Sequence, residues 1–466
     1  MVGRPRARFR AWSRILVAAL VVATLAATLA ATSAATSVAD ERSAPRGLVT
    51  STPGASKGFT LFAPLQLERT YLVDMNGKTV HSWKTDTRPG LSQYLLPNGH
   101  LLRTGNLELQ NAFRDGHGGG GRIEELDWHG NLLWRFDAAD EQHLQHHDIE
   151  PLPNGDVLLI AWERKTAAEA LAAGRSPKLL PDAEVWPDTV MQYRPSTGEI
   201  VWEWRVWDHL IQDRDPTKAN FGDVNLHPEK IDVNHVLEGN RGEKDWNHLN
   251  SVDYDAARDE IILSSRSFSE LWIIDHSTTT VEARGPAGDL RFRYGNPATT
   301  KAEGKRTLYV QHDAERIPAG LPGAGDILVF SNGLPETRPF SSVEQITPTM
   351  VDGDYVDNGD GTFAATAKRI FPRAGSDRFF SAIVSGAQRL PNGDTLMADG
   401  PHGRIIEVNP RGKVVWEYEN PHEGANRRMQ SGAGEPILPG WIFRALRYSP
   451  DDPAVARLSG VDSAHA

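Results

Sequence analysis

Hydrophobic and polar residues alternate along most of the chain in short runs that end at tight turns. One unit places Leu-Pro-Asn-Gly between two such runs, at 96–99, 152–155 and 390–393, with divergent copies at 253–256 and 317–320. A turn of this kind, flanked by residues that alternate with a period of two, is a strong signal for an antiparallel hairpin. Each copy therefore predicts two short strands.

A second unit consists of an apolar strand, a turn and another strand that ends on an aromatic residue. It occurs at 71–83, 123–136, 190–204 and 405–418, with a weaker copy at 271–283. The two units alternate along the chain, and two hairpins make one four-stranded propeller blade. The alternation predicts five complete blades, at 93–136, 146–204, 248–283, 312–370 and 383–418.

A sixth blade is predicted from the two ends of the repeat region. The hairpin at 71–83 lacks a first hairpin, and 441–448 is a lone apolar strand that can pair with it. The content of 13 Trp, 42 Gly and 30 Pro residues also favours many short strands with tight turns over long helices. We therefore predict an all-β fold, a six-bladed β-propeller closed by pairing of its N- and C-terminal strands.

The N-terminus carries the features of an export signal. Five arginines lie within the first 14 residues and precede an uncharged run at 15–35, as in a secretory signal peptide or a single membrane anchor. Ser37 and Ala39 resemble a cleavage site, which favours a released protein. We expect a chain that is secreted, periplasmic or in the cell envelope, and anchored in the membrane if the leader is not cleaved.

Four regions follow from these patterns. They are a signal peptide or membrane anchor at 1–39, a short linker at 40–57, the propeller domain at 58–450 and a C-terminal tail at 451–466.

Charge and cysteine content narrow the function further. Of 50 basic residues, 45 remain without the five leader arginines, against 61 acidic ones. A nucleic-acid partner needs a basic face, so we expect none. The chain has no cysteine, which excludes thiolate nucleophiles and cysteine-bound metal clusters.

Three histidines occupy equivalent places in the repeat. When the five complete first hairpins are aligned on their turns, one position is His147, His248 and His312 in three of them, with Leu91 and Ser385 in the other two. Equal register in a propeller means equal radius and height around the central axis. The three histidines are therefore predicted to point into one central funnel.

Two further polar residues belong to the same predicted floor. The strand 261–266 returns antiparallel to the strand that begins at His248, so Arg266 should lie beside that histidine. Asn250 follows His248 by two positions and shares its face of the strand. Three imidazoles, a guanidinium and a carboxamide suit a tetrahedral oxyanion such as sulfate or phosphate.

Other interpretations of these residues are open at this point. A single histidine at a strand start is usually a surface or hydrogen-bonded residue without a catalytic part. Three histidines can also hold a transition metal, but the fixed cation of Arg266 would repel a dication, so we expect no metal and no other cofactor. His143 and His146 lie off the register or face of His147 and are interpreted as structural.

The segments around these residues resemble one known family. His146-His147-Asp148, His248-Leu249-Asn250-Ser251 with Ser265-Arg266, and Gln311-His312-Asp313 are similar, in this order, to the bacterial arylsulfotransferases that need no nucleotide sulfate donor. The similarity extends from about Gly58 to Trp441. An extra N-terminal β domain that helps some members to form dimers is not expected, because only 40–57 precedes the propeller.

The resemblance implies a six-bladed propeller and a reaction. His312 would be the nucleophile that is transiently sulfated, His147, His248, Asn250 and Arg266 would hold the sulfuryl oxygens, and one histidine would protonate the leaving phenolate. The substrates would be an aryl sulfate donor and a phenolic acceptor in a ping-pong cycle. The alternatives are a metal-dependent propeller hydrolase of lactonase or phosphoesterase type, and a non-catalytic ligand-binding propeller.

Overall fold

The computed structural model describes residues 46–239, 242–373, 378–423, 429–430 and 436–458. The predicted leader at 1–39 lies outside the described residues, and its assignment stays a prediction. The compact unit considered below begins at Gly47. No helix in the described ranges is both long and apolar enough to cross a membrane.

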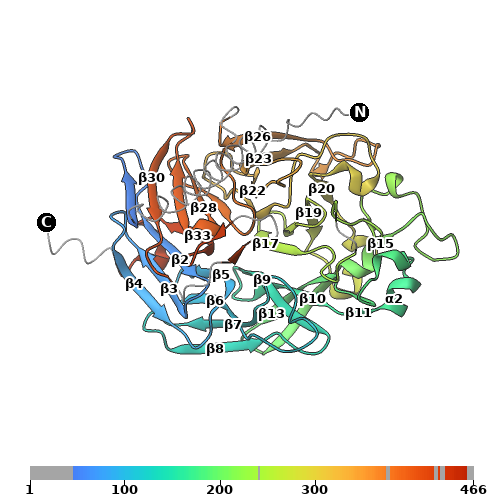
Figure 1. The fold of residues 1–466 in the computed structure, drawn as a ribbon, viewed down its shortest axis with the longest axis horizontal. Helices are drawn as coiled ribbons and strands as arrows, with labels where there is room; N and C mark the ends of the chain where they lie inside the picture. The colour runs from blue at the N-terminus through green and yellow to red at the C-terminus, as the bar shows by residue number, and fades with distance from the viewer. Residues whose placement is uncertain (1–45, 240–241, 374–377, 424–428, 431–435, 459–466) are drawn as a thin grey trace, which may run out of the picture. The chain divides into compact units, whose positions relative to one another are not determined.

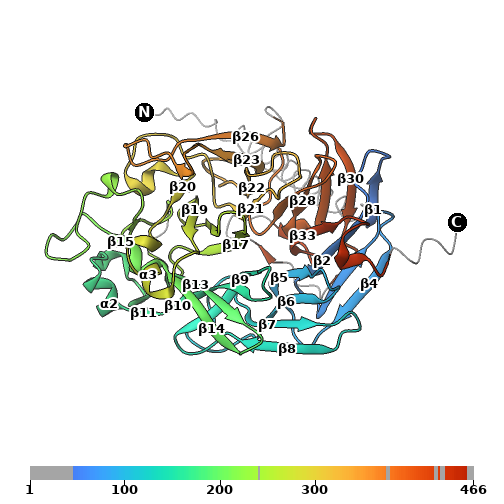
Figure 2. The same ribbon diagram turned by 180° about the vertical axis from the view of Figure 1, so that it is seen from behind.

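Six sheets of antiparallel strands surround a common centre (Figures 1 and 2). From the centre outward, the first three blades contain β33 (Ile442–Tyr448), β2 (Phe59–Pro64), β3 (Arg69–Val73) and β4 (Thr79–Lys84); β5 (Pro89–Leu95), β6 (Leu101–Asn106), β7 (Gly121–Leu126) and β8 (Leu132–Asp137); and β9 (His143–Pro151), β10 (Val157–Glu163), β13 (Asp188–Arg194) and β14 (Glu199–Arg205). The last three contain β17 (Leu249–Asp255), β18 (Glu260–Ser265), β19 (Glu270–Asp275) and β20 (Phe292–Tyr294); β21 (His312–Arg316), β22 (Ile327–Ser331), β23 (Ser342–Pro348) and β26 (Ala365–Phe371); and β27 (Gly386–Arg389), β28 (Thr395–Asp399), β29 (Arg404–Val408), β30 (Val414–Glu419) and β1 (Gly47–Ser51). The innermost strands contact one another in a closed ring. The predicted all-β, six-bladed propeller is confirmed.

Short elements lie outside the blades, mostly in the long insertions of blades 3 to 5. They are β11 (Lys165–Thr166), β12 (Glu184–Val185), β15 (Leu210–Ile211), β16 (Ile231–Asp232), β24 (Met350–Val351), β25 (Asp354–Tyr355), β31 (Met429–Gln430) and β32 (Pro436–Ile437), the helices α2 (Ala167–Ala172) and α3 (Thr280–Ala283), and the 3-10 turns η2 (Pro177–Leu179), η3 (Val206–His209), η4 (Val224–Leu226), η5 (Pro286–Gly288), η6 (Pro297–Thr300), η7 (Gly400–His402) and η8 (Pro453–Val455).

The two ends of the propeller close the ring by strand pairing. β33 pairs antiparallel with β2, with Leu61 opposite Leu446. The predicted partner was the hairpin at 71–83, but β2, which the repeat pattern did not reveal, lies between that hairpin and β33. Gly47–Ser51, inside the segment expected as a linker, forms β1 and adds a fifth strand to blade 6.

Blade 4 differs from the prediction at its outer edge. The fourth strand was expected to end at Ala283, yet Thr280–Ala283 is the helix α3 and the outer strand is β20. Thr279 accepts a hydrogen bond from the backbone N–H of Glu282, and the Glu282 carboxylate accepts one from the Thr279 N–H. This capping box starts a helical turn where the apolar pattern alone suggested a strand.

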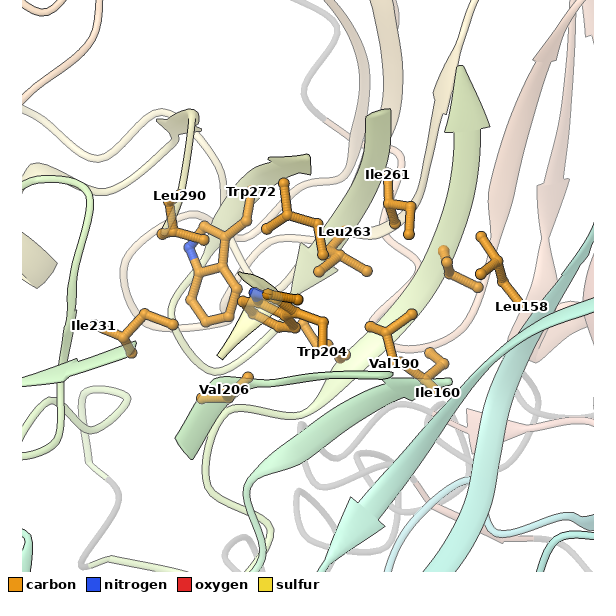
Figure 3. Packing of buried hydrophobic residues seen from close by; sticks show 14 of the residues in the cluster. Leu158, Ile160, Val190, Trp204, Val206, Ile231, Ile261, Leu263, Trp272 and Leu290 are labelled. Carbon is orange, nitrogen blue, oxygen red and sulfur yellow. The ribbon is translucent and has the colours of Figure 1, made fainter. Parts of the chain in front are cut away.

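The core lies between neighbouring blades. In the cluster of Figure 3, Val190 and Trp204 of blade 3 pack with Leu263 and Trp272 of blade 4, and all four side chains are fully buried. The Trp204 indole N–H donates to the Gly288 carbonyl at 2.7 Å, so its polar edge is satisfied. Truncating a buried Trp to Ala typically lowers the free energy of unfolding by about 3–5 kcal/mol. These contacts therefore fix neighbouring blades against each other around the centre.

Candidate active site

The three histidines at the shared repeat position lie on adjacent blades at the centre. His147 is in β9, His248 directly precedes β17, and His312 begins β21. Their exposed fractions are only 4, 7 and 2%. The ring centroids of His147 and His248 are 4.6 Å apart, and Phe443 of β33 lies 6.2 Å from His147 and 6.5 Å from His312. The structure thus brings together the histidines that the register argument selected.

Two of the three histidines have a left-handed backbone conformation. His147 and His248 have φ of +51° and +49°, and Leu91 and Ser385, at the same repeat position, have +110° and +81°. The pairing of each of these histidine strands with its neighbour shifts register beside the histidine, which is the mark of a β-bulge. A left-handed non-glycine residue costs about 1–2 kcal/mol, so the fold maintains this strain at the centre.

Each histidine ring is held through Nδ1 by a different chemical group. His147 Nδ1 lies 2.8 Å from His146 Nδ1, His248 Nδ1 lies 2.5 Å from a carboxylate oxygen of Asp245, and His312 Nδ1 lies 2.7 Å from the amide oxygen of Asn332. None of the three Nε2 atoms makes a hydrogen bond to the described residues. Three ring nitrogens are therefore left available to a ligand.

Sequence reasoning missed these three partners or assigned them no role. His146 was interpreted as structural, and Asp245 was not considered. Asn332 directly follows β22, just as Arg266 directly follows β18. The antiparallel argument that placed Arg266 beside His248 would have placed Asn332 beside His312, had it been applied to blade 5.

Arg266 lies beside His248, as predicted. Its backbone N–H donates to the His248 carbonyl at 3.0 Å, and its half-buried guanidinium forms no ion pair with the carboxylates of the described chain. Burial lowers the pKa of Arg266, and the charges of Asp245 and Glu243 partly oppose this shift. The site therefore contains a guanidinium with unused donors, which suits an anion.

The side chain of Asn250 contacts the residue that precedes His312. Its side chain is fully buried, and its Nδ2 donates to the Gln311 carbonyl at 2.7 Å, while Oδ1 has no hydrogen-bond partner in the described chain. The contact joins β17 to the residue before His312. Asn250 thus packs against the support of His312, and its direct contact with substrate stays a prediction.

The electrostatics keep two of the three rings neutral. Burial and the charges of Arg266 and His248 together lower the pKa of His312 to about 3, against the opposing effect of its hydrogen bond to Asn332. Burial also holds the pKa of His147 well below its usual range, with contributions from His248, His146, His312 and Arg266. Burial opposes ionisation of Asp245, but His248 outweighs it and lowers the pKa of that carboxyl. His248 therefore faces an ionised carboxylate.

The opposite side of the centre is apolar. Leu65, Leu91, Val384 and Phe443 form one buried cluster, with Ile383 and Trp441 packed against it. A cleft of about 570 Å³ opens beside this cluster and is lined by Leu65, Leu91, Trp441 and the glycine-rich segment 116–120. The His147 N–H donates to the Gly118 carbonyl at 2.9 Å, so the cleft adjoins the polar side.

A buried ion network supports the strands below the histidines. Arg444 of the closing strand β33 contacts Asp148 at 2.7 Å and Asp313 at 2.6 Å, the residues that follow His147 and His312. The second carboxylate oxygen of Asp313 accepts from the Ala387 N–H of blade 6. Closure of the ring therefore positions the site directly.

The family model described as Arylsulfotransferase (ASST) matches residues 50–404. The chain belongs to the arylsulfotransferase family. No curated protein matches it. Similar solved structures include a protein of unknown function from Bacteroides caccae (12% identity, 78% of this chain and 94% of that one, TM-score 0.43) and virginiamycin B lyase from Staphylococcus aureus (9% identity, 81% and 85%, TM-score 0.38).

All five predicted site residues lie within the matched segment. The closing strand β33, which supplies Phe443 and Arg444, lies beyond it. No group of three or more His, Asp or Glu side chains is arranged to hold a metal ion in the described part of the chain.

Proposed function

We propose that this protein moves a sulfuryl group from an aryl sulfate ester to a phenol through a covalent intermediate on His312. Membership of the family supports aryl sulfotransfer in general. One observation carries the finer assignment: three central imidazoles with free Nε2 atoms each bind a chemically different partner through Nδ1. The partner sets the protonation state of each ring and hence its part in the reaction.

Asn332 makes His312 the best nucleophile of the three. Its Nδ2 donates to the Ser381 and Val384 carbonyls at 2.8 and 2.9 Å, which turns Oδ1 toward His312. An amide oxygen only accepts, so the His312 proton resides on Nδ1 and the lone pair on Nε2. This neutral nitrogen attacks sulfur, and the bond between sulfur and the aryl oxygen breaks.

His248 is the acid and base in this scheme. Its Nδ1–H donates to the Asp245 carboxylate, which stabilises the imidazolium form. The imidazolium gives its Nε2 proton to the departing phenolate, and neutral His248 then takes the proton of the acceptor phenol. The acceptor oxygen attacks sulfur, the bond from sulfur to His312 breaks, and both rings return to their initial states.

Arg266 and the apolar cluster complete the site. The unpaired guanidinium stabilises negative charge on the sulfuryl oxygens, and the side of the site around Phe443 accommodates the aromatic ring of the donor or acceptor.

A labelling experiment tests the assignment. Mixing the enzyme with an aryl sulfate and no acceptor should leave one sulfuryl group on the peptide that contains His312, and phenol should then remove it. His312→Ala should lose both label and turnover, whereas His248→Ala should retain slow labelling. A label on another residue would refute the assignment, and strict dependence on a divalent metal would favour the propeller hydrolase instead.

We also propose that the leader at 1–39 exports the enzyme, because its arginines and apolar run match an export signal. Fractionation of cells that produce the full chain should place the activity outside the cytoplasm. Activity that stays in the cytoplasmic fraction would refute export.

A further inference from the structure

A fully buried pair of side chains lies behind His147 in blade 3. His146 Nδ1 is 2.8 Å from His147 Nδ1, and His146 Nε2 is 2.7 Å from a carboxylate oxygen of Asp188. The His146 ring stacks on Trp162 at 4.2 Å with an interplanar angle of 11°. His146, Asp188 and Trp162 all have an exposed fraction of zero. This pair connects a site histidine to a carboxylate that is sealed from solvent.

The hydrogen bonds of Asp188 define the proton on His146 Nε2. Oδ1 of Asp188 lies 2.7 Å from His146 Nε2, and Oδ2 accepts from Asn247 Nδ2 and from the Leu249 N–H, both at 2.6 Å. Burial raises the pKa of Asp188, but two N–H donors on Oδ2 and the His146 ring on Oδ1 stabilise its ionised form, so we assign the proton of the contact with His146 to the ring. His146 also lies within ion-pair distance of Asp188, and its ring can form a cation.

One hydrogen lies between the two Nδ1 atoms. Two hydrogens would clash at this short distance, and without any hydrogen the two nitrogen lone pairs would face and repel each other. If His146 is the imidazolium, it donates this hydrogen and His147 is neutral with a hydrogen on Nε2. The other arrangements place a hydrogen on His147 Nδ1. In one of them both rings are neutral and Asp188 has no cation beside it; in the other the extra proton is on His147, and the positive charge lies on the ring nearest the other site histidines.

The surrounding charges favour the first arrangement. His146 is bonded to Asp188 and is close enough to Asp245 to lower the pKa of that carboxyl, so two carboxylates face it. His147 instead faces Arg266, His248 and His312, all of which oppose a positive charge on it. A buried carboxylate left without a cation is costly, whereas a second cation next to Arg266 is repelled.

We infer that the His146–Asp188 pair holds a proton and thereby fixes His147 as the neutral tautomer with a hydrogen on Nε2. His147 then donates to a sulfuryl oxygen without carrying net charge. The donor role rests on the proposed function, whereas the tautomer does not. His146 and Asp188 are positioning residues that act through His147.

Nitrogen NMR of enzyme labelled with ¹⁵N-histidine tests the tautomer directly. His147, assigned by comparison with the His147→Gln variant, should show an unprotonated Nδ1 and a protonated Nε2 at neutral pH, and His146 should show both nitrogens protonated. A proton on His147 Nδ1 in the parent enzyme would overturn the inference, whether or not the enzyme transfers sulfate.

Kinetics provide a second test with matched variants. His146→Leu removes the donor to His147 Nδ1 and should lower kcat/KM about 100- to 1,000-fold, as for loss of one oxyanion donor. His146→Asn provides a carboxamide that can donate in place of the ring and should recover most of this loss. The control His143→Leu changes a half-buried histidine of the same strand, outside the site, and should match the parent.

The kinetic outcomes separate a specific role from a structural one. Equal losses in the Leu and Asn variants, or a Leu variant as active as His143→Leu, would overturn the inference. Absence of transfer in the parent would refute the proposed function. The NMR result alone would then decide the tautomer of His147.

Discussion

Asn332 provides the sharpest test of the proposal that His312 is the nucleophile. Asn332→Leu roughly keeps the side-chain volume and removes the acceptor of the His312 Nδ1–H, so the tautomer with a hydrogen on Nε2 is no longer excluded. A net hydrogen bond contributes about 0.5–1.5 kcal/mol, and about 1.4 kcal/mol is a factor of ten, so sulfation of His312 should slow about 2- to 12-fold. The Val384 carbonyl also loses its donor, whereas the Ser381 carbonyl keeps the Ser341 hydroxyl at 3.2 Å, so the free energy of unfolding should fall by about 1–3 kcal/mol.

Asn332→Asp separates orientation from charge. A carboxylate still accepts from Nδ1, but it stabilises the imidazolium, which has no lone pair on Nε2. In the parent, burial is the main cause that lowers the pKa of His312 to about 3, so the neutral His312 ring persists until the solution becomes strongly acidic. In the Asp variant the pKa rises, and the rate should fall on acidification at a pH about one to three pH units higher.

The assay is the burst of phenolate release from an aryl sulfate with a weakly basic leaving group, without acceptor, across pH. Such a leaving group needs little protonation, so the burst reports on His312. Asn358→Leu, an exposed position in the same blade, is the matched control and should behave like the parent. The role of Asn332 would be refuted if the Leu variant had the burst rate of the parent. It would also be refuted if the burst rate of the Asp variant fell on acidification at the same pH as in the parent.

Three further predictions concern the supports of the site. Arg266→Lys keeps the charge but loses the planar fork, so transfer should fall about 10- to 100-fold with an unchanged circular dichroism spectrum; parental activity would remove Arg266 from the site. Arg444→Met leaves two buried carboxylates unpaired, so urea titration should show a loss of about 3–5 kcal/mol at neutral pH that shrinks in acid as they protonate; a pH-independent loss would contradict this. Gly118→Ala would place a methyl group 2.1 Å from His147 Cε1 at a φ of +91°, so stopped-flow kinetics should show slower sulfation; an unaffected rate would show that the loop yields.

Local patterns in the sequence determined the blades and the selection of the three histidines. Strand alternation and Asn-Gly turns are set by neighbours in the chain, and a repeat converts one such pattern into equivalent positions around an axis. The same logic placed Arg266, because an antiparallel partner is only a turn away. It would also have reached Asn332. It failed at α3, where a capping box overrides an ambiguous apolar run.

Only the tertiary structure decided what each histidine can do. The register treats His147, His248 and His312 alike, and their differences come from the groups that the packed blades bring to Nδ1. Asp188 reaches His146 from another strand, and Arg444 reaches Asp148 from the far end of the chain, 296 residues away. Protonation depends on burial and on charges a few ångströms distant, and such distances between remote segments exist only once the ring has closed.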